Sequence, residues 1–133
     1  FRMKTLIVED DFTSRMVMQQ LLAPYGETHV AVDGKEAITA FKMAWGEKQP
    51  YDLICLDIMM PEMNGQDVLK EIRRLEAEKD IHGFDGAKII MTTALNDRKN
   101  ILEAFRSQCE AYLIKPIDKE KLLEHIRNFG MIA

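Results

Sequence analysis

The stretch LICLDIMMPEMNG (Leu53–Gly65) sets a single carboxylate, Asp57, between four apolar residues and a loop that contains Pro61. The run Leu53–Leu56 has the composition of a strand that is buried on both faces, as in a parallel sheet. Burial of a carboxylate costs free energy unless partners compensate its charge. Asp57 is therefore either an ordinary aspartate that begins a turn or a reactive carboxylate whose partners lie elsewhere in the chain.

Composition narrows the classes of protein to consider. The chain has 133 residues, of which 47% are hydrophobic and 30% charged, as expected for one globular domain. The net charge of -4 argues against nucleic-acid binding through this domain. No apolar run approaches the roughly 20 residues needed to span a bilayer, and no signal peptide is visible. We expect a cytoplasmic protein without membrane attachment.

Five short apolar runs alternate with five amphipathic segments along the chain. The predicted strands are Thr5–Val8, Thr28–Val32, Tyr51–Asp57, Lys88–Thr92 and Ala111–Ile114. The predicted helices are Thr13–Ala23, Lys35–Trp45, Gln66–Glu76, a segment capped by Asn96 or Asp97 that ends near Arg106, and a segment capped by Asp118 that ends near Phe129. Parallel strands require crossovers, so this alternation predicts an α/β protein with a parallel sheet and helices on both faces.

Such sheets bind ligands beyond the carboxyl ends of their strands. The residues at these ends are Glu9, Asp10, Asp11, Asp57, Thr93 and Lys115. Two carboxylates about 4 Å apart repel by about 4 kcal/mol at an effective dielectric constant of about 20, and one lysine cannot neutralise three of them. Hard oxygen ligands suit Mg²⁺. With Mg²⁺ and the ammonium beside it, Asp57 could act as a nucleophile and become an aspartyl phosphate.

The chain closely resembles the receiver domain of bacterial two-component response regulators, the CheY-like family. The matching stretches are LIVEDD, VDGKEA, LDIMMPEMNG, TTA and AYLIKP. The resemblance implies a doubly wound (βα)5, flavodoxin-like fold with strand order 2-1-3-4-5. It also implies a single receiver domain over residues 3–130, with no output domain in this chain.

By this resemblance, Asp57 is the phosphoacceptor. It would receive the phosphoryl group from the phosphohistidine of a sensor histidine kinase or a histidine phosphotransfer protein. Asp10 would bind Mg²⁺ directly and Glu9 through water, and Asp57 and the backbone carbonyl of Met59 would complete the protein ligands. Lys115 would pair with the phosphoryl group.

Further features of the family concern the switch and its output. The resemblance implies that the bond between Lys115 and Pro116 is cis, an isomer open to X-Pro bonds. Thr93 would close on the phosphoryl group while Tyr112 turns inward. These movements would alter the surface of the fourth helix, fifth strand and fifth helix, where a downstream protein of unknown identity or a second copy of the chain would bind. The expected function is a phosphorylation-dependent signalling switch, not an enzyme that turns over an external substrate.

Three departures from the family pattern stand out. Gln108 occupies the place where receivers often have glycine at the end of the fourth helix, so a positive φ there would carry about 1 kcal/mol of strain. Met59 and Leu95 occupy positions that tune hydrolysis of the phosphoryl group, and these apolar side chains predict a long-lived phosphorylated state. The third departure is two long connections.

These connections, Trp45–Pro50 and Glu76–Gly86, precede the third and fourth strands. They are expected to meet at the amino-terminal rim of the sheet, away from the chemistry. Trp45 and Phe84 would pack on each other there or form a docking patch.

Two other classes of function remain as alternatives. A haloacid-dehalogenase-like phosphatase would have a second carboxylate two residues after the nucleophile, where this chain has Met59. A phosphorylation-independent binding module would tend to lose the acceptor, the acidic pair or the lysine, and all of them are present. The sequence does not separate a stand-alone protein from a receiver fragment of a longer regulator.

Overall fold

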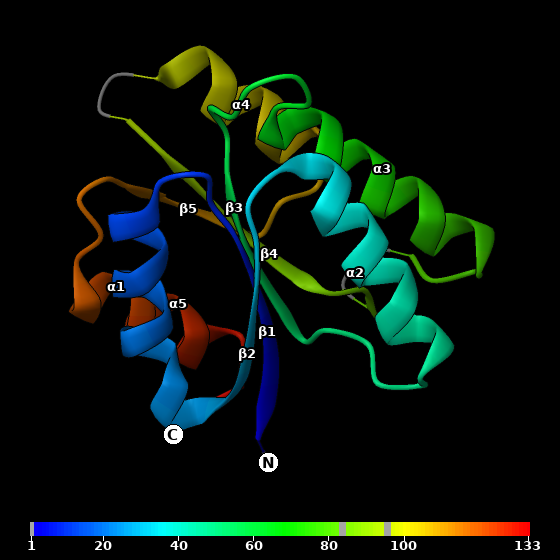
Figure 1. Cartoon of the computed structure of the whole chain (residues 1–133), viewed down its shortest axis with the longest axis horizontal. Helices are drawn as coiled ribbons and strands as arrows, with labels where there is room; N and C mark the ends of the chain where they lie inside the picture. Colours follow the sequence, from blue (N-terminus) through cyan, green and yellow to red (C-terminus); the bar gives the residue numbers. More distant parts are fainter. Residues whose placement is uncertain (1, 83–84, 95–96) are drawn as a thin grey trace.

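The computed structural model describes residues 2–82, 85–94 and 97–133. Within these ranges, strands and helices alternate along the chain (Figure 1). The strands are β1 (Met3–Val8), β2 (Gly26–Ala31), β3 (Leu53–Asp57), β4 (Lys88–Thr93) and β5 (Ala111–Ile114). The helices are α1 (Phe12–Leu22), the 3-10 helix η1 (Ala23–Tyr25), α2 (Gly34–Gly46), α3 (Gly65–Glu78), α4 (Arg98–Arg106) and α5 (Lys119–Asn128).

The strands form one sheet in the order β2-β1-β3-β4-β5, and every neighbouring pair is parallel. This confirms the predicted doubly wound fold and its strand order. Helices α1 and α5 cover one face of the sheet, and α2, α3 and α4 cover the other (Figure 1). None of the helices in the described ranges is long and apolar enough to cross a membrane.

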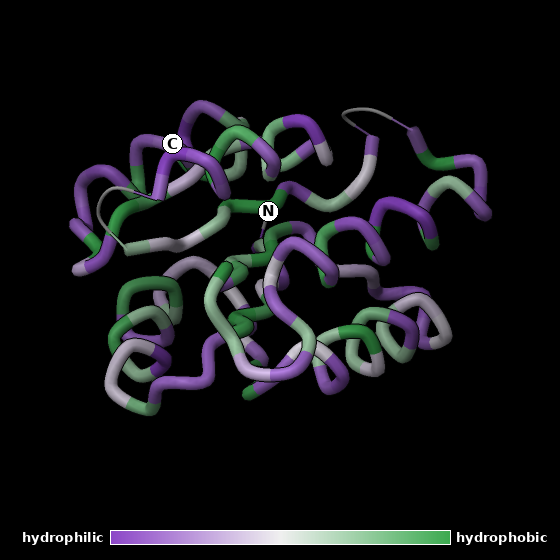
Figure 2. The backbone as a smooth tube through the Cα atoms, turned by 90° about the horizontal axis from the view of Figure 1, so that it is seen from above, coloured by the Kyte–Doolittle hydropathy of each residue, from purple (hydrophilic) through white to green (hydrophobic). Residues whose placement is uncertain are grey.

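Strand β3 lies at the centre of the sheet and separates two hydrophobic clusters. Ile54 and Leu56 belong to the cluster that includes Phe41 of α2, whereas Leu53 and Cys55 belong to the cluster on the α1 and α5 side. All four strand side chains are at most 1% exposed. Burial on both faces explains the uninterrupted apolar run. The strands accordingly form a mostly hydrophobic middle layer between helices with hydrophilic outer surfaces (Figure 2).

Four elements differ from the prediction by two residues at one end. Strand β1 begins at Met3, before the predicted Thr5, and β3 begins at Leu53, after the predicted Tyr51; the other two elements are β2 and α3. Strand β2 begins at Gly26, before the predicted Thr28, because Gly26 pairs with Met3. A Cβ on Gly26 would lie 1.8 Å from the carbonyl oxygen of Met3, so only glycine allows this close approach. Helix α3 continues to Glu78, beyond the predicted Glu76.

Side-chain caps fix the beginnings of four of the five α-helices in the described residues. The capping carboxylates or amides each accept a hydrogen bond from the backbone N–H three residues later, and they are Asp11, Asp33, Asn64 and Asp118. Asp97 holds the corresponding position of α4, as predicted, but its side chain makes no such bond. Asn96, the alternative cap, lies outside the described residues.

The two long connections meet at the amino-terminal rim, as predicted. Pro50 and Gly86, one from each connection, line the same cavity. Trp45 packs against Phe41, with 4.5 Å between the ring centroids, and the Lys79 ammonium lies 5.1 Å from the centroid of the Trp45 ring. The predicted partner of Trp45, Phe84, lies outside the described residues.

Candidate functional site

Asp57 ends β3 at the carboxyl edge of the sheet and is only 3% exposed. The chain turns sharply after it, because the Gly65 N–H donates back to the carbonyl oxygen of Ile58 at 2.9 Å. A Cβ on Gly65 would lie 2.2 Å from the backbone oxygen of Asp57, so glycine is needed where α3 begins. Asn64 then caps α3. The loop in the opening stretch thus folds tightly against the backbone of Asp57.

The acidic residues after β1 lie beside Asp57. Glu9 is 4% exposed, and its backbone N–H donates to Ala31 at 3.0 Å, which continues the pairing of β1 with β2. Glu9, Asp10 and Asp57 each bring a carboxylate oxygen within 4.8 Å of the others. The third acid of this segment, Asp11, points elsewhere and caps α1 through the Ser14 N–H. The structure therefore brings Glu9 and Asp10, both predicted to bind metal, together with Asp57 and sets Asp11 apart.

Lys115 reaches the same cluster from the end of β5. Its backbone N–H donates to the Thr93 carbonyl at 2.8 Å, and the predicted cis bond to Pro116 is present. The ammonium nitrogen lies 2.6 Å from Oε1 of Glu9 and 3.3 Å from Oδ1 of Asp57. One cation from β5 thus contacts carboxylates from β1 and β3.

Charge in this cluster is incompletely balanced. Burial, and after it the neighbouring Glu9 carboxylate, raise the pKa of Asp57 to about 7, although Lys115 opposes the shift. Burial alone would lower the pKa of Lys115, but the carboxylates of Glu9 and Asp57 outweigh it and raise that pKa. One ammonium facing three carboxylates leaves excess negative charge, which fits a hard divalent cation with oxygen ligands such as Mg²⁺.

Both predicted switch residues contact α4 or the residue that precedes it. Thr93 is buried at the end of β4, and its hydroxyl donates to Oδ2 of Asp97 at 2.9 Å. Tyr112 is 37% exposed and packs edge-on against Phe105 of α4, with 5.9 Å between the centroids. The inward position predicted for Tyr112 in the phosphorylated state is thus not the one adopted in this structure.

Met59, the other predicted metal-binding residue, follows Asp57 in the loop. Its backbone N–H donates to Oδ1 of Asp57 at 3.3 Å, and its side chain is 64% exposed. Leu95, which was paired with Met59 in the prediction about hydrolysis, lies outside the described residues. The apolar Met59 side chain therefore stands in solvent next to Asp57.

The sequence matches the family model described as response regulator receiver domain over residues 5–127. The chain belongs to the receiver domain family. The chemotaxis protein CheY of Thermotoga maritima is 31% identical over 123 residues, which cover 91% of this chain and 92% of CheY. The structure of the Vibrio cholerae chemotaxis protein CheY4 is 26% identical, with a TM-score of 0.77, and the match covers 97% of this chain and 99% of that one.

Longer regulators are also similar to this receiver domain. The DNA-binding response regulator MtrA of Mycobacterium leprae is 32% identical over 127 residues, which cover 95% of this chain but only 50% of MtrA. Receiver domains are signalling modules of two-component systems, so phosphorylation-dependent signalling is the general role of this chain.

Several side-chain contacts around the receiver site were not predicted from the sequence. Arg15 donates from Nη1 to the backbone carbonyl of Glu9 at 3.0 Å and so anchors the acidic turn. Asp97 binds the Thr93 hydroxyl, and Gln66 of α3 donates to the backbone carbonyl of Asn100 in α4. The only signal for these contacts was a polar residue in or before a helix, and such a residue does not by itself identify its hydrogen-bond partner.

Proposed function

We propose that this receiver domain is a phosphorylation-controlled switch in which Asp57 accepts a phosphoryl group from a phosphohistidine. The observation that carries the proposal is the position of the Lys115 ammonium, which contacts both Glu9 and Asp57 at the carboxyl edge of the sheet. This arrangement combines a nucleophile, a cation for phosphoryl oxygens and acids for a metal.

In the proposed reaction, an oxygen of the ionised Asp57 carboxylate attacks the phosphorus atom. The new O–P bond forms as the P–N bond to the partner's histidine breaks, and the imidazole nitrogen leaves with the electron pair and takes up a proton. Lys115 holds its positive charge against the phosphoryl oxygens. Burial of Asp57 at 3% exposure limits access of bulk water.

Glu9, Asp10, Asp57 and the backbone carbonyl of Met59 are the proposed ligands of Mg²⁺. The cluster of three carboxylates and the raised pKa of Asp57 support this assignment. When bound, the metal would reduce repulsion between the carboxylates and an incoming phosphoryl group.

The proposed output involves Thr93 and Tyr112. After phosphorylation, Thr93 donates its hydroxyl hydrogen to the phosphoryl group and Tyr112 moves inward from its exposed position. Helix α4 and strand β5 also carry the exposed apolar side chains Leu102, Phe105 and Ile114. We propose that the α4-β5-α5 surface binds a downstream protein, or a second copy of the chain, after this change.

The wider setting is also part of the proposal. The partner that supplies the phosphoryl group is a sensor histidine kinase or a histidine phosphotransfer protein, and the location is cytoplasmic. Residues 3–130 act as one receiver domain, which itself binds no nucleic acid.

Intact-mass measurement after incubation with Mg²⁺ and acetyl phosphate tests the function directly. We expect the protein to gain one phosphoryl group and the Asp57→Asn variant to gain none. Absence of the gain in the parent protein, together with failure to bind Mg²⁺, would overturn the proposal and favour a phosphorylation-independent binding module.

A further inference from the structure

The Thr93 hydroxyl already has a hydrogen-bond acceptor before any phosphoryl group is present. Thr93 is 1% exposed, and its Oγ lies 2.9 Å from Oδ2 of Asp97. A hydroxyl carries a single hydrogen to donate. Thr93 therefore cannot donate to Asp97 and to a phosphoryl oxygen on Asp57 at the same time.

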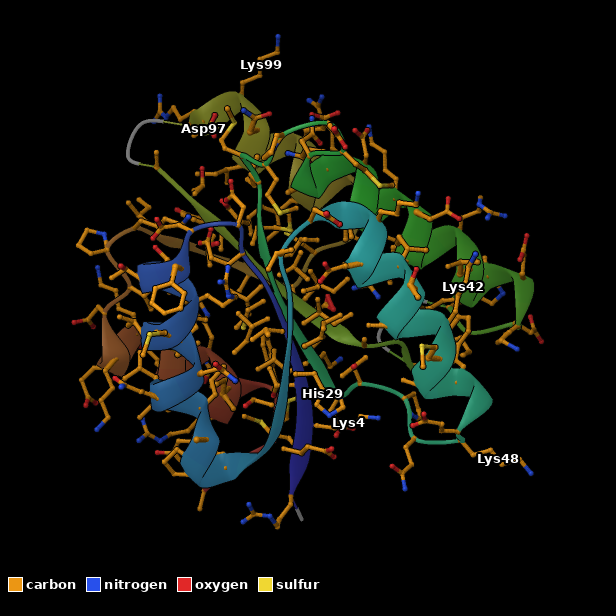
Figure 3. All side chains as sticks on the ribbon, in the orientation of Figure 1. Lys4, His29, Lys42, Lys48, Asp97 and Lys99 are labelled. Atoms are coloured by element: carbon orange, nitrogen blue, oxygen red, sulfur yellow. The ribbon has the colours of Figure 1, made fainter. Side chains whose placement is uncertain are left out.

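Asp97 makes this contact instead of capping its own helix. Its side chain, labelled at the start of α4 in Figure 3, accepts from the side-chain Nδ2 of Asn100 at 2.6 Å through Oδ1. The four other helices are capped by a bond to the backbone N–H three residues on, which in α4 would be that of Asn100. Both oxygens of Asp97 are thus engaged by side chains, and the preferred capping bond is absent.

The contact between α3 and α4 next to Asp97 contains an unsatisfied polar atom. Gln66 is 3% exposed, and its Nε2 donates to the backbone carbonyl of Asn100. Its Oε1 has no hydrogen-bond partner among the residues that the structure describes. A buried acceptor without a hydrogen-bond partner costs free energy.

We propose that Asp97 is a positioning residue that holds the Thr93 hydroxyl in the unphosphorylated protein and competes for it with the phosphoryl group. This inference rests on the proposed function, because it concerns the response of Thr93 to phosphorylation of Asp57.

The competition has a defined direction. The acceptor on Asp97 is a carboxylate with one negative charge, whereas a phosphoryl group carries about 1.5 to 2 negative charges at neutral pH. The phosphoryl group therefore wins the hydrogen, but only after the bond to Asp97 is broken. Binding that requires a minor conformation is weakened by the fraction of molecules in that conformation. Loss of the Asp97 carboxylate should strengthen binding of a phosphoryl mimic.

Isothermal titration calorimetry with beryllofluoride and Mg²⁺ tests this prediction on the full chain. We expect Asp97→Ala to bind the mimic about tenfold more tightly than the parent, which corresponds to about 1.4 kcal/mol. In a Thr93→Ala background, the same substitution should change the affinity much less, because no hydroxyl remains to be held.

The double-mutant cycle also separates this effect from simple charge removal. Loss of a carboxylate near an anion site favours anion binding by itself, and that contribution persists in the Thr93→Ala background. The Asp97→Asn variant removes the charge but keeps an acceptor oxygen, so its affinity should fall between those of the parent and Asp97→Ala. If Asp97→Ala does not fold, Asp97→Asn carries the same cycle.

The outcomes distinguish this inference from the proposed function. Suppose that the parent protein binds beryllofluoride and gains a phosphoryl group. If Asp97→Ala then does not increase the affinity for beryllofluoride, or increases it equally with and without the Thr93 hydroxyl, only the role of Asp97 is overturned. A parent protein that neither binds the mimic nor gains a phosphoryl group would overturn both proposals.

Discussion

The guanidinium group of Arg73 donates two hydrogen bonds to the backbone carbonyl of Gln108, from Nε at 3.0 Å and from Nη2 at 2.8 Å. Arg73 belongs to α3, whereas Gln108 lies between α4 and β5. Gln108 has a φ of 73°, which lies in the left-handed region. A positive φ was expected here because receivers often have glycine at this position. The contact ties the end of α4, beside the proposed output surface, to α3.

Gln108→Gly should stabilise the protein. Glycine relieves the cost of a left-handed backbone, and the side chain of Gln108 is exposed. The gain is partly offset by the greater freedom of glycine in the unfolded chain, so we expect about 0.5 to 1 kcal/mol in the free energy of unfolding. Urea denaturation measures it. Gln108→Ala, which keeps the strain, is the matched control, and an equal gain from both variants would refute the explanation.

Arg73→Ala should be strongly destabilising. The Arg73 side chain is 11% exposed and forms ion pairs with Glu76 at 2.6 Å and Glu110 at 2.7 Å, so its loss leaves two buried carboxylates without their cation. Removal of one partner from a buried ionic network costs about 3 to 5 kcal/mol. Chemical denaturation should show a loss of this size.

The adjacent Arg74 provides a matched control for Arg73. Its side chain is 55% exposed and pairs with Glu71 and Glu78 on the surface of the same helix. Exposed pairs contribute at most about 1 kcal/mol, so Arg74→Ala should be nearly neutral. Similar losses from the two arginine variants would contradict the importance of burial.

The contribution of Asp57 to the stability of the metal-free protein should fall as the pH rises. The pKa of Asp57 is raised from 3.8 to about 7 in the folded protein. Between these values the folded protein retains a proton that the unfolded chain has released, so the free energy of unfolding decreases with increasing pH. Relative to Asp57→Asn, we expect the parent to lose about 2 kcal/mol or more between about pH 4 and about pH 8.

Denaturation in the presence of a chelator measures this pH dependence, with Asp57→Asn as the reference. Mg²⁺ added at the higher pH should restore stability to the parent and much less to the variant, which lacks one proposed ligand. Parallel pH profiles for the two proteins would show that Asp57 does not carry a raised pKa.

Met59→Asn should shorten the lifetime of the phosphorylated protein. The Met59 side chain stands in solvent beside Asp57 and offers no strong hydrogen-bonding group to water. A carboxamide there can orient a water molecule toward the phosphoryl group, and we expect loss of phosphate to be about tenfold faster, equivalent to about 1.4 kcal/mol in the barrier. Intact mass followed over time gives the rate. Met59→Leu should behave like the parent; a lifetime unchanged in Met59→Asn would reject the idea.

The fold followed from local patterns in the sequence. Apolar runs such as Leu53–Leu56 indicate strands that are buried on both faces. Because these runs alternate with amphipathic segments, they predict a parallel sheet with helices on both faces. Placement of Glu9, Asp57 and Lys115 at one edge follows from the same geometry, because parallel strands end on the same side. These features depend on periodicity and chain direction, which a sequence carries explicitly.

Tertiary structure alone decided which side chains pair. The sequence does not show that Arg73 is buried against Glu110 whereas the neighbouring Arg74 pairs on the surface with Glu78. The bond from Thr93 to Asp97 was equally hidden, because an aspartate before a helix is normally expected to cap it. Such pairings depend on distances of a few ångströms between separate elements, and these distances are set only when the whole chain has packed.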